Sequence, residues 1–247
     1  MVDIEIELQD RSQEATHCAY CGKQLNENSI RYINGEGFCD SVCEKVANNF
    51  NRYGTKIKEV LEQSTKPLYR NTSVEMLKGN LAHPERIDQV LNWQYDAKSP
   101  NGLIIFGESG AGKTRALTLL LKKLITQDLV GVSEHSLKVF YAGELERAIM
   151  SSFGDIRNYD KLIANLSNVG LLVIDDFGKE KFTERFEVAI FAIFENRISN
   201  LKPTIFTTNF VGESFQKRFT DKEQFQPFYR RIKEFNNAIY FKRKEQQ

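Results

Sequence analysis

The chain has 247 residues, which is enough for one substantial domain and a small additional module. Apolar residues make up 41% and charged residues 27%, as in soluble globular proteins, and no apolar run approaches the roughly 20 residues that a membrane helix needs. Residues 1–10 contain four acids and no base, unlike a signal or transit peptide, so we expect a cytoplasmic protein with no membrane partner.

The formal net charge of +1 is divided unequally along the chain. Residues 1–50 contain four basic and nine acidic residues, a net charge of −5. Residues 51–247 contain the other 30 basic and 24 acidic residues, a net charge of +6. This asymmetry predicts that the two parts of the chain bind different partners.

The N-terminal region contains all four cysteines. Apolar residues alternate with acids over residues 1–10, which predicts a half-buried strand. The cysteines follow as two pairs, Cys18-x₂-Cys21 and Cys39-x₃-Cys43. Paired thiols in a cytoplasmic chain indicate a metal rather than a disulfide, and four thiolates form a closed, structural Zn²⁺ site.

Glycines near the cysteine pairs provide turns for a small knuckle and hairpin, namely Gly22, Gly35 and Gly37. His17 is an alternative ligand, although we expect it to face solvent. Four thiolates around Zn²⁺ add about −2 to an already acidic region. Such a surface repels nucleic acid, so we expect the module to bind a protein.

Residues 44–66 are polar and rich in lysine, with sparse apolar positions, and predict a connecting helix that ends near Pro67. We therefore divide the chain into a zinc-binding module over residues 1–50, a linker helix over residues 51–67 and a larger domain over residues 68–247.

Short apolar strands alternate with helices in the larger domain. Strands are expected at Leu103–Phe106, Leu137–Tyr141, Leu171–Ile174, Thr204–Thr208 and Ala238–Phe241, and helices at Ala116–Ile125, Glu144–Met150 and residues 182–198. Uniformly apolar strands separated by helices predict an α/β fold with a parallel sheet covered by helices on both faces.

A complete phosphate-loop motif follows the first of these strands. The segment reads Gly107-Glu108-Ser109-Gly110-Ala111-Gly112-Lys113-Thr114 and matches G-x-x-x-x-G-K-[ST] at every fixed position. Backbone N–H groups of the loop and the helix N-terminus that follows would surround the phosphates of ATP. Lys113 would reach the β- and γ-phosphates, and the Thr114 hydroxyl would bind Mg²⁺.

Two further strands end in polar residues that complete such a site. The strand at Leu171–Ile174 is followed by Asp175 and Asp176, which lie at the carboxyl edge of the predicted sheet. Asp175 would hold Mg²⁺, and Asp176 would orient or deprotonate the attacking water. Asn209 follows the strand at Thr204–Thr208 and is either a sensor of the γ-phosphate or a turn-capping residue.

These elements together resemble the AAA+ ATPases of the replicative helicase-loader group, the DnaC/DnaI-like and IstB-like proteins. The residues that match are Gly107–Thr114, L-L-V-I-D-D-F-G at Leu171–Gly178 and T-I-F-T-T-N at Thr204–Asn209. The resemblance extends over about residues 68–241. The cysteine region is similar, more loosely, to the zinc-binding N-terminal region of some loaders.

The resemblance implies an arginine that enters the ATP site of a neighbouring subunit, so self-assembly into an oligomer or filament is expected. Arg231 is the first choice and Arg230 the alternative, while a solvated basic helix face is the structural alternative. Candidate contacts to single-stranded DNA are Arg157, Lys161 and, by stacking, Phe153.

The implied function is an ATP-dependent loader of the hexameric replicative DNA helicase, which the zinc module would bind. Two alternatives remain open. The first is an IstB-like ATPase that assists transposition, whose motor domain would look the same. The second is an adaptor that binds ATP with little turnover, although intact Lys113, Asp175 and Asp176 argue against it.

Overall fold

The computed structural model describes residues 31–33, 36–38, 44–132, 136–141, 143–179 and 182–244. The strand predicted over residues 1–10 and the four cysteines, Cys18, Cys21, Cys39 and Cys43, lie outside the described residues. Strands β1 (Arg31–Ile33) and β2 (Glu36–Phe38) pair antiparallel. The hairpin expected before the second cysteine pair is therefore present, while the zinc site stays a prediction.

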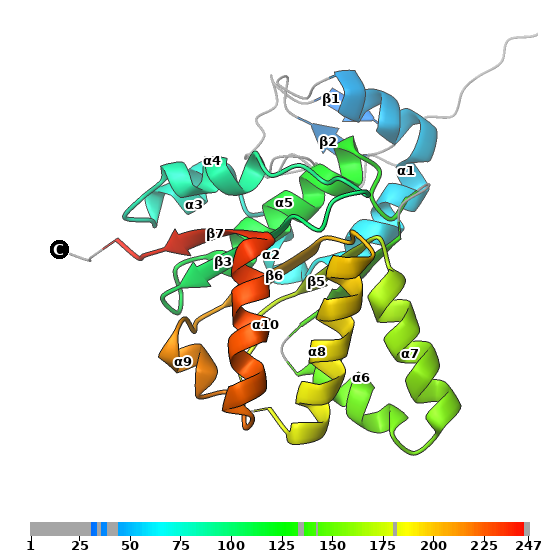
Figure 1. Ribbon diagram of the computed structural model, residues 1–247. Helices are drawn as coiled ribbons and strands as arrows, with labels where there is room; N and C mark the ends of the chain where they lie inside the picture. Colours follow the sequence, from blue (N-terminus) through cyan, green and yellow to red (C-terminus); the bar gives the residue numbers. More distant parts are fainter. Residues whose placement is uncertain are drawn as a thin grey trace, which may run out of the picture.

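A five-stranded parallel sheet forms the centre of the protein (Figure 1). Its order is β4 (Leu137–Phe140), β5 (Leu171–Ile174), β6 (Thr204–Thr208), β3 (Gly102–Gly107) and β7 (Asn236–Phe241). The predicted parallel sheet and all five predicted strands are confirmed. Because β6 lies between β3 and β5, the chain segments that follow these three strands meet at one edge of the sheet.

One face of the sheet is covered by the helices that precede or directly follow β3. These are α1 (Glu44–Ser64), α3 (Val74–Gly79), α4 (Glu85–Leu91) and α5 (Lys113–Gln127), with the short α2 (Pro67–Arg70) beside them. Leu103 and Ile105 of β3 point into this layer, as do Leu171 and Val173 of β5. These strand residues alternate with residues that face the opposite layer, so both faces are apolar.

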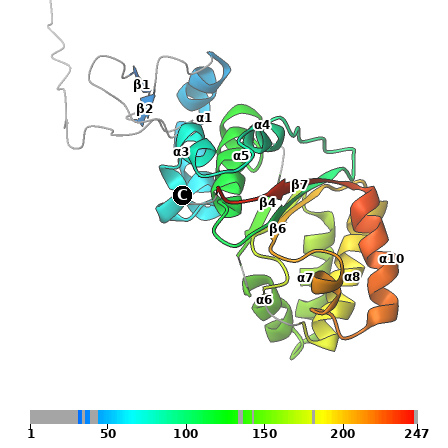
Figure 2. The ribbon, with the colours of Figure 1, turned by 90° about the vertical axis from the view of Figure 1, so that its left-hand side faces the viewer.

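The opposite face is covered by the later helices, as the rotated view shows (Figure 2). These are α6 (Glu144–Ser152), α7 (Ile156–Asn168), α8 (Glu184–Ser199), α9 (Glu213–Gln216) and α10 (Lys222–Glu234). Phenylalanines fill much of this second core, and Phe177 contacts four others at its centre.

Helix α1 begins at Glu44 and spans the module boundary that we predict at residue 50. Its apolar side chains, including Phe50 and Ile57, belong to the same core as the sheet. The predicted helix ending near Pro67 is present, but it packs along α5 instead of standing apart as a linker. Among the described helices, none is long and apolar enough to cross a membrane.

Candidate nucleotide-binding site

The phosphate loop joins β3 to α5 and depends on its glycines for packing. Gly107 and Gly112 have φ angles of 134° and 86°, which disfavour side chains. A Cβ at Gly107 would lie 2.0 Å from the carbonyl oxygen of Phe241 in β7. A Cβ at Gly112 would lie 2.4 Å from the side chain of Leu77 in α3. Two neighbouring elements therefore enclose the loop.

Lys113 opens α5 and is buried inside the loop. Its ammonium donates hydrogen bonds to the carbonyl oxygens of Gly107 (3.1 Å) and Glu108 (2.7 Å). Burial lowers the pKa of Lys113, while the charges of Asp176, Asp175 and Glu108 oppose that shift. The cation is thus held where the loop surrounds a phosphate in proteins that contain this motif.

The carboxylate of Asp175 connects α5 to the sheet. It is 2% exposed and follows β5 directly. The Thr114 hydroxyl donates to it and lies 3.0 Å from both oxygens, and the Thr207 hydroxyl of β6 donates to Oδ1 at 2.6 Å. Sequence reasoning missed Thr207, because the strand pattern does not show which threonine of β6 faces its neighbour.

The pKa of Asp175 is raised, chiefly because burial disfavours the charged carboxylate. The hydrogen bonds from Thr207 and Thr114 lower that pKa, and so does the charge of Lys66, while the charge of Asp176 raises it further. The Thr114 hydroxyl and the Asp175 carboxylate together fit Mg²⁺, which prefers oxygen ligands.

Asp176 begins a tight turn that keeps its side chain partly exposed at the site. Its φ of 61° lies in the left-handed region, which aspartate tolerates better than most residues. Its backbone N–H donates to the Thr207 hydroxyl at 2.8 Å, and the N–H of Phe177 donates to the Thr207 carbonyl oxygen at 2.8 Å. Buried Phe177 then anchors the turn in the second core.

Asn209 is exposed and follows the last residue of β6, Thr208. Thr208 lies opposite Phe106 in the parallel register, so Asn209 lies beside the start of the phosphate loop. The structure therefore places Asn209 at the same sheet edge as Lys113 and Asp175. Its proposed contact with the attacking water stays a prediction.

Tyr141 and Lys66 form a further wall of the site that sequence reasoning missed. Tyr141 follows β4, and its hydroxyl donates to the carbonyl oxygen of Ser64 at the end of α1 (2.9 Å). The ammonium of Lys66 lies 4.0 Å from the centre of the Tyr141 ring. Burial, aided by the charge of Asp175, raises the pKa of Tyr141 to about 12. No motif links these two residues, so only the fold reveals them.

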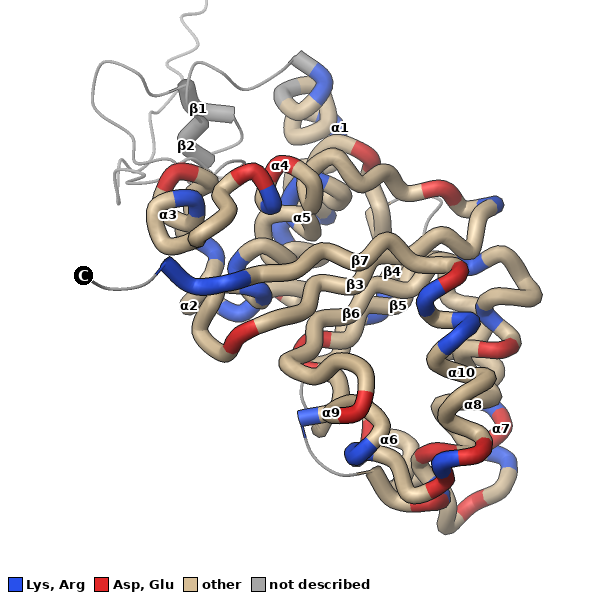
Figure 3. Tube along the Cα trace, turned by 60° about the vertical axis from the view of Figure 1, so that its left-hand side comes forward, with Lys and Arg blue, Asp and Glu red and all other residues tan. Residues whose placement is uncertain are grey.

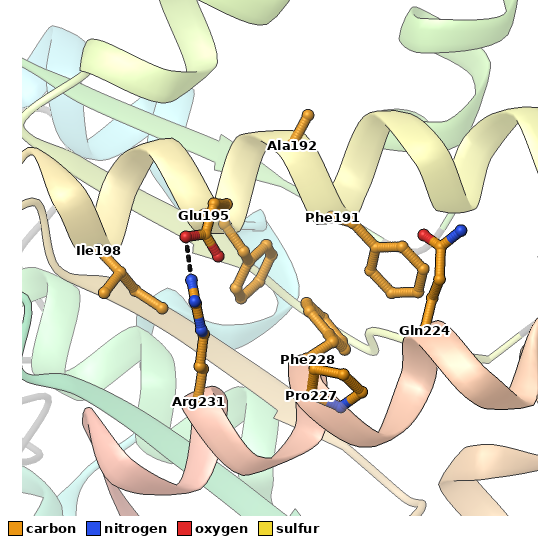
Figure 4. A pocket seen from close by; sticks show the side chains of 9 residues that line it. Phe191, Ala192, Glu195, Ile198, Gln224, Pro227, Phe228 and Arg231 are labelled. Atoms are coloured by element: carbon orange, nitrogen blue, oxygen red, sulfur yellow. Dashed lines mark ion pairs between the residues drawn. The ribbon is translucent and has the colours of Figure 1, made fainter.

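Arg231 lies far from the phosphate loop of its own chain. It is in the last turns of α10, which leads into β7 at Asn236, and Asn236 pairs with Gly102 at the start of β3. The loop follows the other end of β3. Arg231 forms an ion pair with Glu195 of α8 and borders an apolar cavity of about 350 Å³ between α8 and α10 (Figure 4). If Arg231 acts on a nucleotide, that nucleotide must be bound by a neighbouring subunit.

The candidate DNA contacts lie around the start of α7. Arg157 and Lys161 are exposed on this helix. Phe153 is partly buried and stacks on Tyr159, with ring centres 4.8 Å apart. Its ring is therefore already engaged within the protein, while the two basic residues stay predictions.

Comparison with solved structures finds similar folds among replication proteins. The structure of DnaI matches with a TM-score of 0.54 and 20% identity, over 75% of this chain and 94% of that chain. The DnaC helicase loader matches with a TM-score of 0.51 and 20% identity, over 76% and 99%. The replication initiator DnaA, bound to AMPPCP and single-stranded DNA, matches with a TM-score of 0.52 and 16% identity, over 72% and 50%.

No protein-family model matches the sequence, and no curated protein sequence matches it. The chain spans about half the length of DnaA but nearly all of DnaI and DnaC. At these identities the likeness shows the fold alone, a parallel sheet covered by helices on both faces with the phosphate loop after β3, as we predict from the sequence.

We expect Asp175→Asn to make the protein more resistant to urea at neutral pH when nucleotide and metal are removed. The pKa of Asp175 is raised above its ordinary value of 3.8. The parent protein therefore loses stability as the pH rises through the pKa that Asp175 has in the unfolded chain. The loss is complete above the higher pKa that Asp175 has in the folded protein. The amide has no such loss.

Urea midpoints measured from about pH 4 to about pH 8 with a chelator present should show an advantage of the variant that grows with pH. Asp160→Asn, on the exposed surface of α7, serves as the control. An advantage independent of pH would show that the carboxylate is not the cause.

Proposed function

We propose that this chain is a magnesium-dependent ATPase that loads a hexameric replicative DNA helicase onto single-stranded DNA. The observation that carries the ATPase assignment is the contact between Thr114 and Asp175 beside buried Lys113. Residues from two separate motifs are therefore neighbours in the fold. Together they offer an ammonium for the phosphates of ATP and oxygen atoms for Mg²⁺.

Each residue at this edge has a defined role in the proposal. Lys113 and the loop N–H groups bind the phosphates, and Thr114 and Asp175 hold Mg²⁺, which when bound withdraws charge from the phosphate oxygens. Asp176 orients the attacking water and accepts its proton. Asn209 hydrogen-bonds the same water from the neighbouring strand, which fixes the direction of attack.

The loader assignment rests on the extent of the structural likeness. This chain covers 94% of DnaI and 99% of the DnaC helicase loader, but only 50% of DnaA. The likeness thus extends over most of each loader structure but over only half of the initiator, which favours a loader in this proposal. The transposition ATPase has the same expected motor, so identification of the partner has to separate the two.

Lys113→Ala should lower the affinity for ATP on the order of a hundredfold, because it removes a charge-assisted contact to two phosphates. Titration of the full chain with a fluorescent ATP analogue measures the affinity, and phosphate release measures turnover. Lys56→Ala removes an exposed lysine of α1 and should match the parent. Near-parental turnover in Lys113→Ala would disprove the ATPase assignment.

Arg231→Ala should bind ATP as the parent does but lose turnover by about 10³-fold, because a trans-acting arginine stabilises mainly the transition state. Turnover per parent subunit should rise with protein concentration. Mixing Arg231→Ala with Lys113→Ala should restore part of the turnover, since some interfaces then combine an intact loop with an intact arginine.

Arg230→Ala is the matched control for this experiment and should be milder, because the neighbouring side chain leaves Arg231 in place. No recovery in a mixture whose subunits are shown to co-assemble would remove Arg231 from the trans role and make Arg230 the candidate.

The protein should carry one zinc ion per chain, held by the four cysteines. Cys21→Ser should lose the metal and the binding of the hexameric helicase, yet retain ATP binding, because the ATPase core is formed by other residues. Metal analysis of protein purified without chelators and co-sedimentation with helicase test this. Helicase binding by a zinc-free variant would contradict the proposed route.

A further inference from the structure

A run of three basic residues, Lys242, Arg243 and Lys244, follows β7 and has no part in the motifs described so far. It appears as a continuous blue stretch towards the end of the described chain (Figure 3). Backbone hydrogen bonds fix it against the connection between α3 and α4. The N–H of Ala82 donates to the Lys242 carbonyl oxygen, and that of Lys244 donates to the Asn80 carbonyl oxygen, both at 3.1 Å.

The same run is bonded to the phosphate loop on its other side. The N–H of Arg243 donates to the carboxylate of Glu108 at 3.0 Å. The N–H of Glu108 in turn donates to the carbonyl oxygen of Phe241 at 3.1 Å. Glu108 of the phosphate loop thus holds the loop and the basic run together.

The side chain of Arg243 lies against the glycine-rich part of the loop. A Cβ at Gly110 would be 3.6 Å from Nη1 and 3.7 Å from Cδ of Arg243, so the arginine side chain lies on the side of Gly110 where a side chain would begin. Side chains alternate along an extended chain, so Lys242 and Lys244 point away from the face that Arg243 presents. Within the described residues, the Arg243 guanidinium forms no ion pair with an acid.

We propose that Arg243 binds the phosphates common to ATP and ADP, from the same subunit as the phosphate loop; this inference rests on the nucleotide binding proposed above. The glycine-rich part of such a loop cradles the α- and β-phosphates, whereas its lysine reaches the β- and γ-phosphates. A guanidinium beside Gly110 is therefore close to the phosphates that both nucleotides share.

The chemistry of the guanidinium and the fixed position of its backbone both favour phosphate binding. A guanidinium presents a planar fork of donors that matches phosphate oxygens. The backbone of Arg243 is fixed by Glu108 and by its pairing with Leu81, so binding would cost side-chain freedom but no further ordering of the backbone. In this proposal Arg243 increases the nucleotide affinity of its own subunit, whereas Arg231 increases ATP turnover in a neighbouring subunit.

The test is equilibrium binding of fluorescently labelled ADP and of AMPPCP to the full-length protein. Arg243→Met should weaken both nucleotides by about tenfold, which is the loss expected for one charge-assisted contact. Arg243→Lys should be intermediate, because it keeps the charge and loses the fork. Lys244→Met removes the same charge from the adjacent position and should bind both nucleotides as the parent does. Urea midpoints establish that each variant is folded.

The outcomes separate this inference from the proposed function. If Lys113→Ala loses nucleotide and Arg243→Met does not, the inference is wrong while the ATPase assignment stands. Equal weakening by Lys244→Met would show a diffuse charge effect and would also overturn it. Weaker binding of single-stranded DNA by Arg243→Met, with unchanged nucleotide affinity, would assign the basic run to DNA instead.

Discussion

The site depends on the hydrogen bonds that converge on the buried carboxylate of Asp175. Thr114 donates to it from the first turn of α5 and Thr207 donates to it from β6, so one side chain connects the phosphate loop to two strands. Burial of a carboxylate is unfavourable, as the raised pKa of Asp175 shows. The folded state accepts this cost at the position where a cation would be bound, which is the usual compromise between stability and activity.

The strand order explains why these groups meet. With β6 inserted between β3 and β5, the segment after each strand emerges at one edge, and residues separated by about a hundred positions become neighbours. The packing of the loop adds a second constraint, because Gly107 lies against β7 and Gly112 lies against Leu77 of α3. The loop is therefore enclosed by β7 of the sheet and by α3 of the helical layer that contains α5.

The sequence predicts the strands, the parallel sheet and the residues of the phosphate loop, because uniform apolar runs and a fixed glycine pattern are local signals. It does not predict Thr207, Tyr141 or Arg243, whose importance arises from contacts between distant segments. It also misjudges how α1 packs, since sparse apolar positions in a lysine-rich helix look like a linker until Phe50 and Ile57 are seen in the core. Such long-range contacts have no periodicity to reveal them.

The C-terminal segment contains two arginines that lie near opposite ends of β7. Arg231 precedes β7 and Arg243 follows it, so this six-residue strand, roughly 20 Å long, lies between them. β7 is an edge strand that pairs only with β3 among the described strands, and β3 leads directly into the phosphate loop. A neighbour that displaces Arg231 from Glu195 would act on α10, and only Phe235 separates α10 from β7, whose far end, Phe241, lies against the loop at Gly107. β7 therefore joins the end of α10 near Arg231 to the phosphate loop, through the hydrogen bond that the N–H of Glu108 donates to the carbonyl oxygen of Phe241.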